Sequence, residues 1–414
     1  MFERVAITGI SSISCFGLGH QAFVEAIRSS RCGIAPVTSF DTAECRSHCA
    51  ALIRGFDPAT FIPPLKLRKI DAVGRVALAS TRLLFDDAGC PPAPGGRDDI
   101  GIALGTATAG LDSLVEYLAG LTDHGPSGVP AILFSNTVSN APASLCAIEF
   151  GLRGPNVTFN QREASSFGAL IFSVGAIRQR RTAAMVTGGV DCVEETFFKV
   201  HDRFRALSPM RGERGAAGTE AARPFDRRRN GFILGEGGFL VLIESASTAE
   251  ARGAHVYGEI VGVGATGSKA ALNDWPADCS GLVRAMRLAL SDAKLSTEEI
   301  ACVVATSNGS PRLDQQEAEA IAEVFGTRSI PVASVKGAIG ESGAAGAASL
   351  IAGLLTMPAG EVMPTVGFSA RDPALSVRVS NAPQPAPGET FLVNSVASGG
   401  TNCSIAVRVT PERP

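Results

Sequence analysis

The amino-acid sequence predicts an α/β protein in which parallel sheets are covered by helices. Short apolar runs rich in β-branched residues alternate along the chain with longer helical stretches, a pattern typical of this class. The clearest runs are residues 5–9, 100–105, 184–189, 239–243, 301–306 and 391–396. Two of the runs continue into similar turns about 200 residues apart, at 101–108 and 302–309. This repetition indicates a duplicated α/β half.

Length and composition favour a large protein with much buried sheet. The chain has 414 residues, enough for two core-forming halves, and 45% of them are apolar against 19% charged. A formal net charge of −3 argues against nucleic acid or an anionic membrane surface as a partner. No apolar run reaches the roughly 18–20 residues that a membrane-spanning helix needs.

The N-terminus and the cysteines predict a cytoplasmic location. Residues 1–9 enter a strand-and-glycine pattern directly, without the basic and apolar regions of a signal peptide. Ten cysteines are scattered without a disulfide-like framework, which is typical of a reducing compartment. Cys45, His48 and Cys49 are the one tight Cys/His group, and no second ligand pair stands at the spacing of a zinc site. We therefore expect neither a metal nor a cofactor.

The chain is predicted to divide into two halves, residues 1–253 and 254–414. A helical stretch at 245–253 leads into the second half. Residues 209–222 are polar and rich in Gly, Ala and Arg, which indicates a surface loop. The Pro-rich residues 383–388 are predicted to form a loop before the last two strands.

Six sets of short motifs, spread over the whole chain, carry a family resemblance. They are Val5-Ala-Ile-Thr-Gly-Ile10; Gly151-Leu-Arg-Gly-Pro155; Met185-Val-Thr-Gly-Gly-Val-Asp191; Arg223-Pro-Phe-Asp226 with Gly231-Phe-Ile-Leu-Gly-Glu-Gly237; Ala251-Arg-Gly-Ala-His255; and Asn394-Ser395 with Gly399-Gly-Thr-Asn402. In this order and at this spacing they resemble the elongating β-ketoacyl synthases, which work on acyl carrier protein. The resemblance implies a thiolase-like fold, in which duplicated α/β halves form a five-layer αβαβα sandwich.

The first catalytic residue of that family is a cysteine at the N-terminus of a buried helix, which takes the acyl chain as a thioester. It stands nine residues after the glycine of the Gly-Pro pair, and counting from Gly154 that position is Glu163. The distance onward to Gly188-Gly189 also fits, and the nearest cysteines are Cys146 and Cys192. The resemblance therefore implies that the nucleophile has been replaced.

Two histidines of the family hold the malonyl thioester, assist decarboxylation and stabilise the enolate. The first stands eight residues before an aspartate that leads into an acidic helix. Asp314 and Glu317 are present, and the counted position is Thr306. The second follows a lysine turn and a glycine. Lys336 is present, and the counted position is Glu341. Neither motif contains any of the five histidines, which are His20, His48, His124, His201 and His255.

Retained scaffold motifs with three substituted catalytic positions predict a retained fold and a lost activity. In this interpretation Glu163 and Glu341 are structural replacements that form buried hydrogen bonds or ion pairs with Lys336, Arg162 or Asn308. The alternative makes Glu163 a base or nucleophile in altered chemistry. That alternative lacks an enolate stabiliser, because both histidines are gone, and losing even one such donor typically costs about 100- to 1000-fold in rate.

The family has a branch of this kind, the chain-length factor or ketosynthase β-subunit of type II polyketide synthases. It pairs with an active ketosynthase α-subunit, and the growing chain, delivered on acyl carrier protein, lies in a tunnel between the two. By resemblance the tunnel is lined by the helix at 110–118 and by the interface segment at 132–140. The apolar candidates for setting product length are Leu111, Leu114, Leu133, Phe134 and Val138. Each of them is equally well explained as an ordinary interface or core residue.

Three functions stay open at this point. The first is the non-catalytic subunit of a heterodimeric synthase. The second is an enzyme in its own right, a malonyl decarboxylase or acyltransferase that uses Glu163. The third is a self-associating acyl-binding protein without a synthase partner. Chain-length factors of aromatic polyketide systems usually carry glutamine at the position of Glu163, so the glutamate leaves a polyene-type system or a related lipid pathway open, with the polyene type favoured.

Other features have structural interpretations. The basic runs 178–181 and 227–229 are predicted to be solvated surface or partner contacts. Ser165 and Ser166 have no adjacent base in the sequence, which favours helix packing over a nucleophilic role.

Overall fold

A mixed sheet of twelve strands organises the residues that the computed structural model describes, which are 3–91, 95–129, 131–210 and 220–411. Its strands are β1 (Val5–Ser14), β2 (Gly17–Leu18), β5 (Ile100–Gly105), β6 (Asn156–Phe159), β7 (Ala184–Asp191), β9 (Gly237–Ser245), β10 (Gly258–Gly267), β11 (Cys302–Val304), β12 (Pro331–Ala333), β14 (Arg378–Val379), β16 (Thr390–Val396) and β17 (Thr401–Val409). They pair in the order β14-β12-β11-β16-β17-β10-β1-β9-β7-β5-β6, with β2 beside β1.

The same strand order occurs twice. The path β6-β5-β7-β9-β1 and the path β12-β11-β16-β17-β10 both run third, second, fourth, fifth, first when the strands of each set are numbered along the chain. In both sets the first two pairings on the path are parallel and the last two antiparallel. An antiparallel pairing of β1 with β10 joins the two sets. The similar turns noted in the sequence follow β5 and β11, the second strand of each set.

The expectation of parallel sheets is wrong for part of each set. β16 and β17 are joined by a tight turn in which the backbone N–H of Ala397 donates to the carbonyl of Thr401 at 2.8 Å. A connection this short makes a hairpin, because parallel neighbours need a crossover of a dozen or more residues. Each of the two sets of strands therefore combines parallel and antiparallel pairings.

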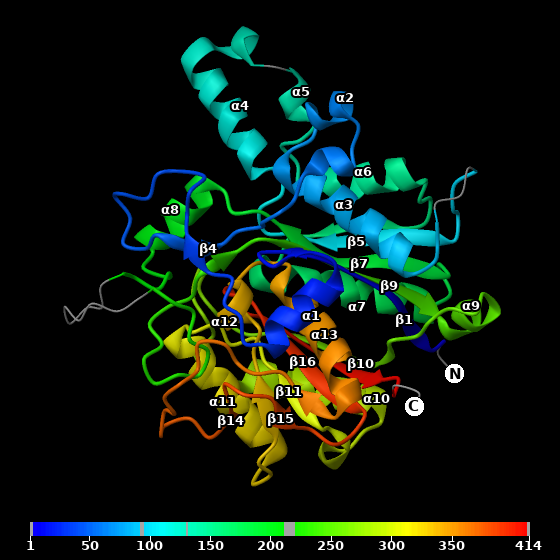
Figure 1. Cartoon of the computed structure of the whole chain (residues 1–414), viewed down its shortest axis with the longest axis vertical. Coiled ribbons are helices and arrows are strands. Elements are labelled where there is room, and N and C mark those ends of the chain that lie inside the picture. The colour runs from blue at the N-terminus through cyan, green and yellow to red at the C-terminus, as the bar shows by residue number, and fades with distance from the viewer. Residues whose placement is uncertain (1–2, 92–94, 130, 211–219, 412–414) are drawn as a thin grey trace.

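Helices complete five layers, which confirms the predicted sandwich. The first layer holds α3 (Ala72–Asp87) and α6 (Ala141–Phe150), the middle layer holds α1 (His20–Arg28), α7 (Ser165–Arg178) and α13 (Ala345–Thr356), and the last holds α10 (Ser280–Ala293) and α11 (Pro311–Phe325). α3 and α6 pack on the N-terminal set of strands, and α10 packs on the C-terminal set. α7 and α13 lie between the two sets (Figure 1).

The middle layer has the most demanding packing because it contacts a sheet on each side. α13 is buried along almost its whole length and is built from Ala, Gly, Leu, Ile, Ser and Thr, as expected of a helix with no solvent face. Small residues permit the close approach. A Cβ on Gly346 would lie 2.7 Å from the ring of Phe167 on α7. A Cβ on Gly105 of β5 would lie 2.2 Å from the backbone of Ser165. The start of α7 is thus pressed directly against β5.

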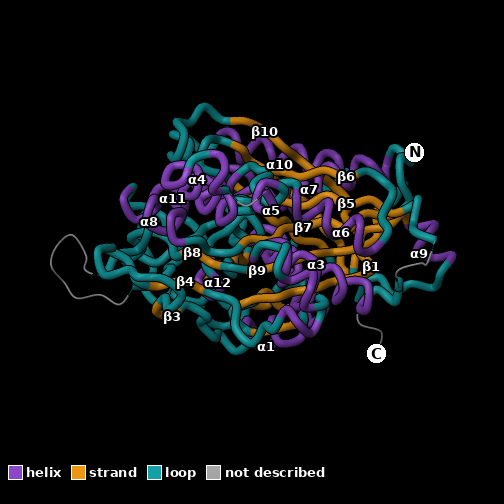
Figure 2. The backbone as a smooth tube through the Cα atoms, turned by 90° about the horizontal axis from the view of Figure 1, so that it is seen from above, coloured by secondary structure: helices purple, strands orange, loops and turns teal. Residues whose placement is uncertain are grey.

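The remaining elements lie around this sandwich. They are α2 (Pro64–Leu67), α4 (Leu111–His124), α5 (Ala131–Phe134), α8 (Glu195–Arg203), α9 (Ala246–Ala251), α12 (Lys336–Ile339), the small sheet β3 (Ala35–Pro36), β4 (Cys49–Ala51) and β8 (Leu234–Gly235), the pair β13 (Glu361–Val362) and β15 (Gln384–Pro385), and five 3₁₀ turns, Pro58–Thr60, Pro126–Gly128, Arg162–Ala164, Thr297–Glu299 and Met357–Ala359. The small sheet lies on the side of the molecule opposite the two termini (Figure 2).

Several local expectations changed. The predicted helix at 110–118 extends to His124, and the Pro-rich loop at 383–388 contains the short strand β15. Most of the predicted loop at 209–222 lies outside the described residues, since 211–219 are not described. The predicted boundary at 253/254 falls between α9 and β10 and stays a prediction.

The basic runs 178–181 and 227–229 are mostly exposed, as predicted, and Arg178 and Arg229 are the exceptions. Arg178 forms an ion pair with Asp292 at 2.6 Å with its side chain 14% exposed, and Arg229 forms one with Asp372 at 2.6 Å with 9% exposed. These arginines tie separate segments together because their positions on α7 and in the loop before β8 face neighbouring elements. Arg227 is exposed.

Candidate functional site

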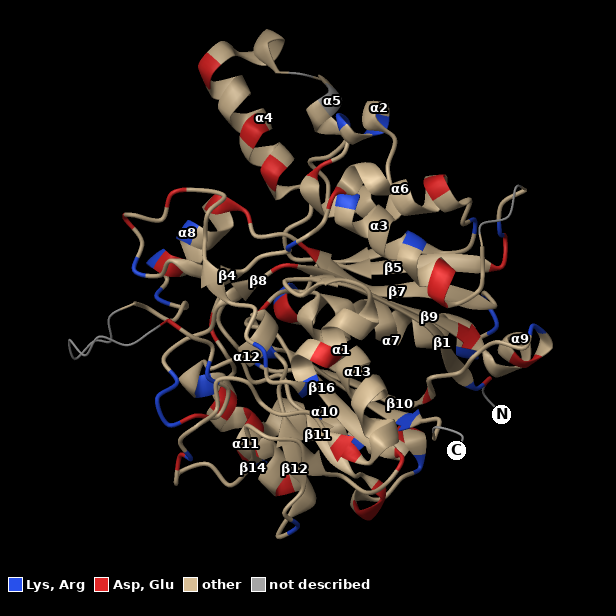
Figure 3. Ribbon diagram, viewed as in Figure 1, with Lys and Arg blue, Asp and Glu red and all other residues tan. Residues whose placement is uncertain are grey.

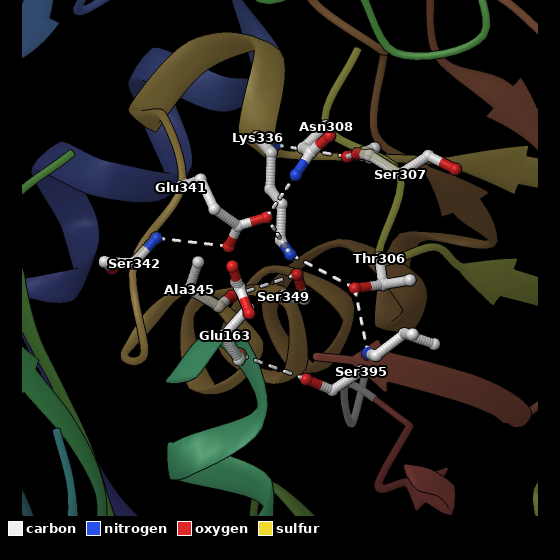
Figure 4. A network of polar contacts seen from close by, with 12 residues as sticks. Glu163, Thr306, Ser307, Asn308, Lys336, Glu341, Ser342, Ala345, Ser349 and Ser395 are labelled. Carbon is white, nitrogen blue, oxygen red and sulfur yellow. Dashed lines mark hydrogen bonds and ion pairs between the residues drawn. The ribbon is translucent and has the colours of Figure 1, made fainter. Parts of the chain in front are cut away.

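The three positions that motif counting assigned to catalysis lie together near the starts of α7 and α13. Glu163 lies in the 3₁₀ turn Arg162–Ala164 that precedes α7, Glu341 lies between α12 and α13, and Thr306 follows β11. The backbone N–H of Ser166 donates to the carbonyl of Gly343 at 2.9 Å, which holds the two helix starts side by side. In Figure 4 the carboxylates of Glu163 and Glu341 point toward one another.

A buried lysine links two of these positions. The Nζ of Lys336 lies 2.8 Å from Oε2 of Glu341 and donates to Oγ1 of Thr306 at 3.1 Å. Lys336 is 1% exposed and Glu341 2%. The amide of Asn308 also donates to Oε2 of Glu341, at 2.7 Å, and the backbone N–H of Ser342 donates to Oε1 at 3.1 Å. The Glu341 carboxylate is thus engaged on both oxygens.

Electrostatics at Glu341 are balanced between opposing effects. Burial raises the pKa of this carboxyl to about 7, while Lys336 acts to lower it and the nearby Glu163 carboxylate acts to raise it. A buried charge is tolerated only where it is paired and hydrogen-bonded. Lys336 and Asn308 meet that requirement here, so Glu341 belongs to a hydrogen-bonded network.

The acidic residues of α11 hold the loop that carries Thr306. Glu317 accepts the backbone N–H groups of Thr306 at 3.0 Å and Ser307 at 2.7 Å. Asp314 accepts those of Phe225 at 2.6 Å and Asn308 at 3.1 Å. Burial raises the pKa of Asp314 to about 7. Both carboxylates are fully buried, and they organise backbone rather than face a cavity.

Glu163 is held from the C-terminal hairpin. The backbone N–H of Ser398 donates to its Oε2 at 3.0 Å, and the Ser398 hydroxyl donates to Oε1 at 3.0 Å. Nε of Arg162 lies 3.7 Å from Oε2. The contacts expected for structural replacements are therefore present at Glu163 and at Glu341, whereas the roles of these residues stay predictions.

The neighbouring serines are occupied by the backbone. The Ser165 hydroxyl donates to the carbonyl of Arg162 at 2.6 Å, and the Ser166 hydroxyl accepts the N–H of Ala347 at 3.2 Å. Neither makes a hydrogen bond to a base within the part of the chain that the structure describes. An activated nucleophile needs such a partner.

A cavity of about 160 Å³ opens beside Glu163 and Glu341. Two residues that motif counting did not assign to the site also line it, Cys192 at the end of β7 and His201 on α8. Burial raises the pKa of the Cys192 thiol well above its ordinary value, which disfavours the thiolate that a nucleophilic cysteine needs. His201 lies 38 positions after Glu163 in the sequence, and only the fold brings it to the cavity. No sequence motif predicts that His201 lines the cavity.

The predicted tunnel residues lie elsewhere. Leu111 and Leu114 are on α4, Leu133 and Phe134 are on α5, and Val138 is in the segment before α6. None of them lines the cavity beside Glu163. α4 and α5 project from the body of the molecule (Figure 1), and Leu114, Phe134 and Val138 are 37%, 64% and 47% exposed.

Across residues 3–91, 95–129, 131–210 and 220–411 there is no group of three or more His, Cys, Asp and Glu side chains that could hold a metal ion. The Cys45, His48 and Cys49 group has structural contacts instead. Nδ1 of His48 lies 3.1 Å from the Thr42 hydroxyl, and the backbone N–H of Cys49 donates to Glu220 at 2.8 Å. Over the same ranges, no helix is both long and apolar enough to span a bilayer.

Comparison with known proteins is consistent from end to end of the chain. The "Beta-ketoacyl synthase, N-terminal domain" family matches residues 2–249, and the "Beta-ketoacyl synthase, C-terminal domain" family matches residues 257–369. The chain is 27% identical to 3-oxoacyl-[acyl-carrier-protein] synthase 2 of Coxiella burnetii, over 98% of each chain. It is 29% identical to the tetracenomycin polyketide synthase ketoacyl synthase beta subunit of Streptomyces glaucescens, again over 98% of each.

A solved structure described as the ishigamide ketosynthase/chain length factor superposes with a TM-score of 0.91 at 28% identity, covering 99% of this chain and all of the other. Similarity to a synthase and to a beta subunit is thus almost equal. Overall sequence identity does not distinguish the role of a synthase from that of a beta subunit. That distinction depends on the residues at the site.

Proposed function

Because this chain belongs to the β-ketoacyl synthase family, we propose that it is a non-catalytic chain-length factor of a type II polyketide synthase. In this role it pairs with an active ketosynthase and shapes the tunnel in which the acyl chain grows. The observation that carries the proposal is the identity of the residues at the three counted positions, Glu163, Thr306 and Glu341. Lys336 joins Thr306 to Glu341, and Ser398 holds Glu163 beside them.

The chemistry of condensation has no obvious agent here. A thioester needs a thiolate, and the cysteine of the cavity wall, Cys192, is buried with a raised pKa. Enolate stabilisation needs donors aimed at the developing oxyanion. Thr306 accepts hydrogen bonds from Lys336 and from the N–H of Val396, at 3.1 and 3.2 Å, and Lys336 is committed to Glu341. This mutual engagement of the polar groups supports the proposal of a non-catalytic role.

A surface suited to a partner supports pairing. Leu114, Leu118 and Leu121 of α4 are 37%, 49% and 36% exposed, and their spacing of four and three places them on one face of the helix. Only Ser113 of α4 is buried. Phe134 of α5 lies 6.1 Å from the ring of Tyr117 and extends this apolar face. A helix so little buried by its own chain requires another surface to cover it.

Two further features fit the same partner. α4 carries acidic residues and no lysine or arginine (Figure 3), so a partner with basic groups around an apolar centre is complementary. β6 is an edge strand of the sheet and, among the described residues, pairs with β5 alone. Exposed edges are ready to pair with another strand. Leu111, Leu114, Leu133, Phe134 and Val138 would then line the tunnel and set product length by their bulk.

The test is carbon dioxide release and chain extension from malonyl-acyl carrier protein. Three samples are compared: this chain, a ketosynthase partner with an intact Cys-His-His set, and the co-expressed pair. We expect extension from the pair alone, with turnover largely unchanged when this chain carries Glu163→Ala. Glu319→Ala, at an exposed position of α11, is the matched control outside the site. Carbon dioxide release by the isolated chain that Glu163→Ala abolishes would contradict the proposal.

One observation favours a second candidate, a stand-alone malonyl decarboxylase or acyltransferase. Glu163 shares its cavity with His201, so a carboxylate and an imidazole are close to one another. That candidate predicts activity without a partner, and activity that depends on both side chains. The polyene-type product suggested by Glu163 is a separate prediction, which product analysis of the pair tests.

A further inference from the structure

A second cavity, of about 670 Å³, borders β14, an edge strand of the sheet. One wall is the turn between α11 and β12, and the other is the segment that leads into β14. In Figure 1 α11 and β14 lie at the opposite end of the molecule from α4. The cavity shares no lining residue with the one beside Glu163. Its volume is in the range of small-molecule sites in proteins.

Part of the wall of this second cavity is apolar. Ile321 and Ile330 are each 3% exposed, and Phe368, Val377 and Val379 are half-buried. All five residues line the cavity. An apolar group placed against them would leave water, which is favourable in proportion to the area that is buried.

The same cavity is basic. Of the residues that line it within the described part of the chain, three are arginines and none is acidic. The side chains of Arg371 and Arg378 are exposed, and across the described ranges neither makes a hydrogen bond or an ion pair. Both can therefore turn toward a ligand without breaking a contact. Asp372, the neighbour of Arg371, is already paired with Arg229 at 2.6 Å.

Hydroxyl groups add further donors to the cavity. Thr327, Ser329 and Ser376 line it and are exposed. The third arginine, Arg328, lies beside two of them and donates from Nη2 to the carbonyl of Ile300 at 2.7 Å. A phosphate monoester offers three terminal oxygens and up to two negative charges, and guanidinium groups bind phosphate through paired N–H donors. This set of donors therefore fits a phosphate better than a carboxylate.

We propose that this cavity binds a phosphate monoester whose substituent is a small apolar group. Arg371 and Arg378 hold the phosphate, and the apolar group lies against Ile321, Ile330 and Phe368. Neither a ketosynthase partner nor a role in setting chain length is needed for this site, which goes beyond the proposed function.

Phenyl phosphate is the probe, compared with inorganic phosphate and with phenol. Calorimetric titration of the full-length chain at about pH 8, where the ester is a dianion, should show phenyl phosphate binding more tightly than either. Its affinity should fall as salt is added. The double variant Arg371→Gln with Arg378→Gln should weaken binding by about tenfold or more. Arg68→Gln with Arg181→Gln, at two other exposed arginines, is the matched control and should keep the wild-type affinity.

A second variant adds a charge to the cavity. Ser376→Asp, at an exposed position, should also weaken binding of phenyl phosphate, whereas Ser291→Asp, exposed on α10, should not. Equal affinity of the arginine double variant and its control would overturn the proposal, as would phenol or inorganic phosphate binding as tightly as the ester. Flotation with vesicles that contain phosphatidic acid separates a lipid headgroup from a soluble ester. Binding to the vesicles without binding of phenyl phosphate would also overturn it.

Discussion

Lys336 and Glu341 show how the residue at one buried position supplies the charge that its neighbour needs. A lysine that is 1% exposed needs a partner, and a carboxylate at position 341 provides one at 2.8 Å. The carboxylate of Glu341 balances the positive charge of Lys336 within the site. The same pairing explains why a retained family lysine does not by itself indicate retained chemistry.

Removing the lysine should therefore be costly. At pH 8, where Glu341 is ionised, we expect Lys336→Met to lower the free energy of unfolding by about 3–5 kcal/mol, because a buried carboxylate loses its counterion. Urea denaturation measures this. Lys199→Met is the matched control, since the pair of Lys199 with Glu195 is exposed and such pairs contribute little to stability. Equal effects of the two substitutions would contradict the prediction.

The pKa of Glu341 predicts a pH dependence of stability. Burial raises this pKa from 4.5 to about 7, so between these values the folded state binds more protons than the unfolded state. The contribution of this group to stability is then present at low pH and is lost as pH rises from about 4.5 to about 7. Asp314 acts in the same direction.

Urea denaturation from pH 4.5 to 7.5 tests this. The loss of stability with rising pH should be smaller in Glu341→Gln than in the wild type. Glu319→Gln, at an exposed position of α11, should leave the wild-type slope. A Glu341→Gln slope equal to that of the wild type would mean that Glu341 does not titrate in this range.

At the scale of elements, the position of α7 decides where Glu163 points. The start of this helix is pressed against β5 at Gly105 and is bonded to the turn before α13 through Ser166 and Gly343. Helix, strand and turn belong to three separate stretches of sequence. The geometry of the site is therefore a property of how these elements pack.

Two glycine substitutions separate packing from helix propensity. Gly105→Ala should lower the free energy of unfolding by about 1–3 kcal/mol, because its Cβ would meet the backbone of α7 at 2.2 Å. Gly175→Ala, in the interior of α7, should raise it by about 0.5–1 kcal/mol, because no atom lies within 4 Å of the added Cβ. Thermal or urea unfolding gives both signs, and a neutral Gly105→Ala would show that α7 can move.

The exposed face of α4 predicts a selective effect on pairing. Leu118→Asp would place an unpaired charge in the proposed interface, so we expect heterodimer formation to weaken by about tenfold or more. Stability of the isolated chain should change by no more than about 0.5 kcal/mol, because Leu118 is 49% exposed. Leu272→Asp, at a leucine 79% exposed in the turn between β10 and α10, is the control for pull-down or sedimentation. Equal pairing by both variants would exclude this face.

At the scale of the whole molecule, an uncovered helix and an uncovered sheet edge predict the behaviour of the chain alone. Obligate interfaces commonly exceed roughly 2,000 Å², and a surface of that kind left bare should cause self-association or poor solubility. Size-exclusion chromatography with light scattering is the measurement, on the chain alone and with its partner. A well-behaved monomer would count against an obligate partner, and homodimers that retain acyl ligands would favour the self-associating acyl-binding alternative.

Sequence and structure contribute differently to these conclusions. The strands at 100–105 and 184–189 were predicted to within two residues because apolar β-branched runs bounded by glycine are a local signal. Counting from Gly154 and Lys336 identified Glu163 and Glu341. The structure places these residues just before α7 and α13. Antiparallel pairing of β16 with β17 was missed, since pairing direction depends on the connection and not on strand composition.

The sequence alone established the family resemblance and the repeated α/β pattern, and it predicts the replacement of all three catalytic residues, because each of these depends on residue identity at a fixed spacing. Tertiary structure decided the rest. It joined Lys336 to Glu341 and Ser398 to Glu163, and it brought His201 and Cys192 to the cavity wall. These residues come from elements that are distant in sequence, and close packing of the middle layer between two sheets is the physical reason that they meet.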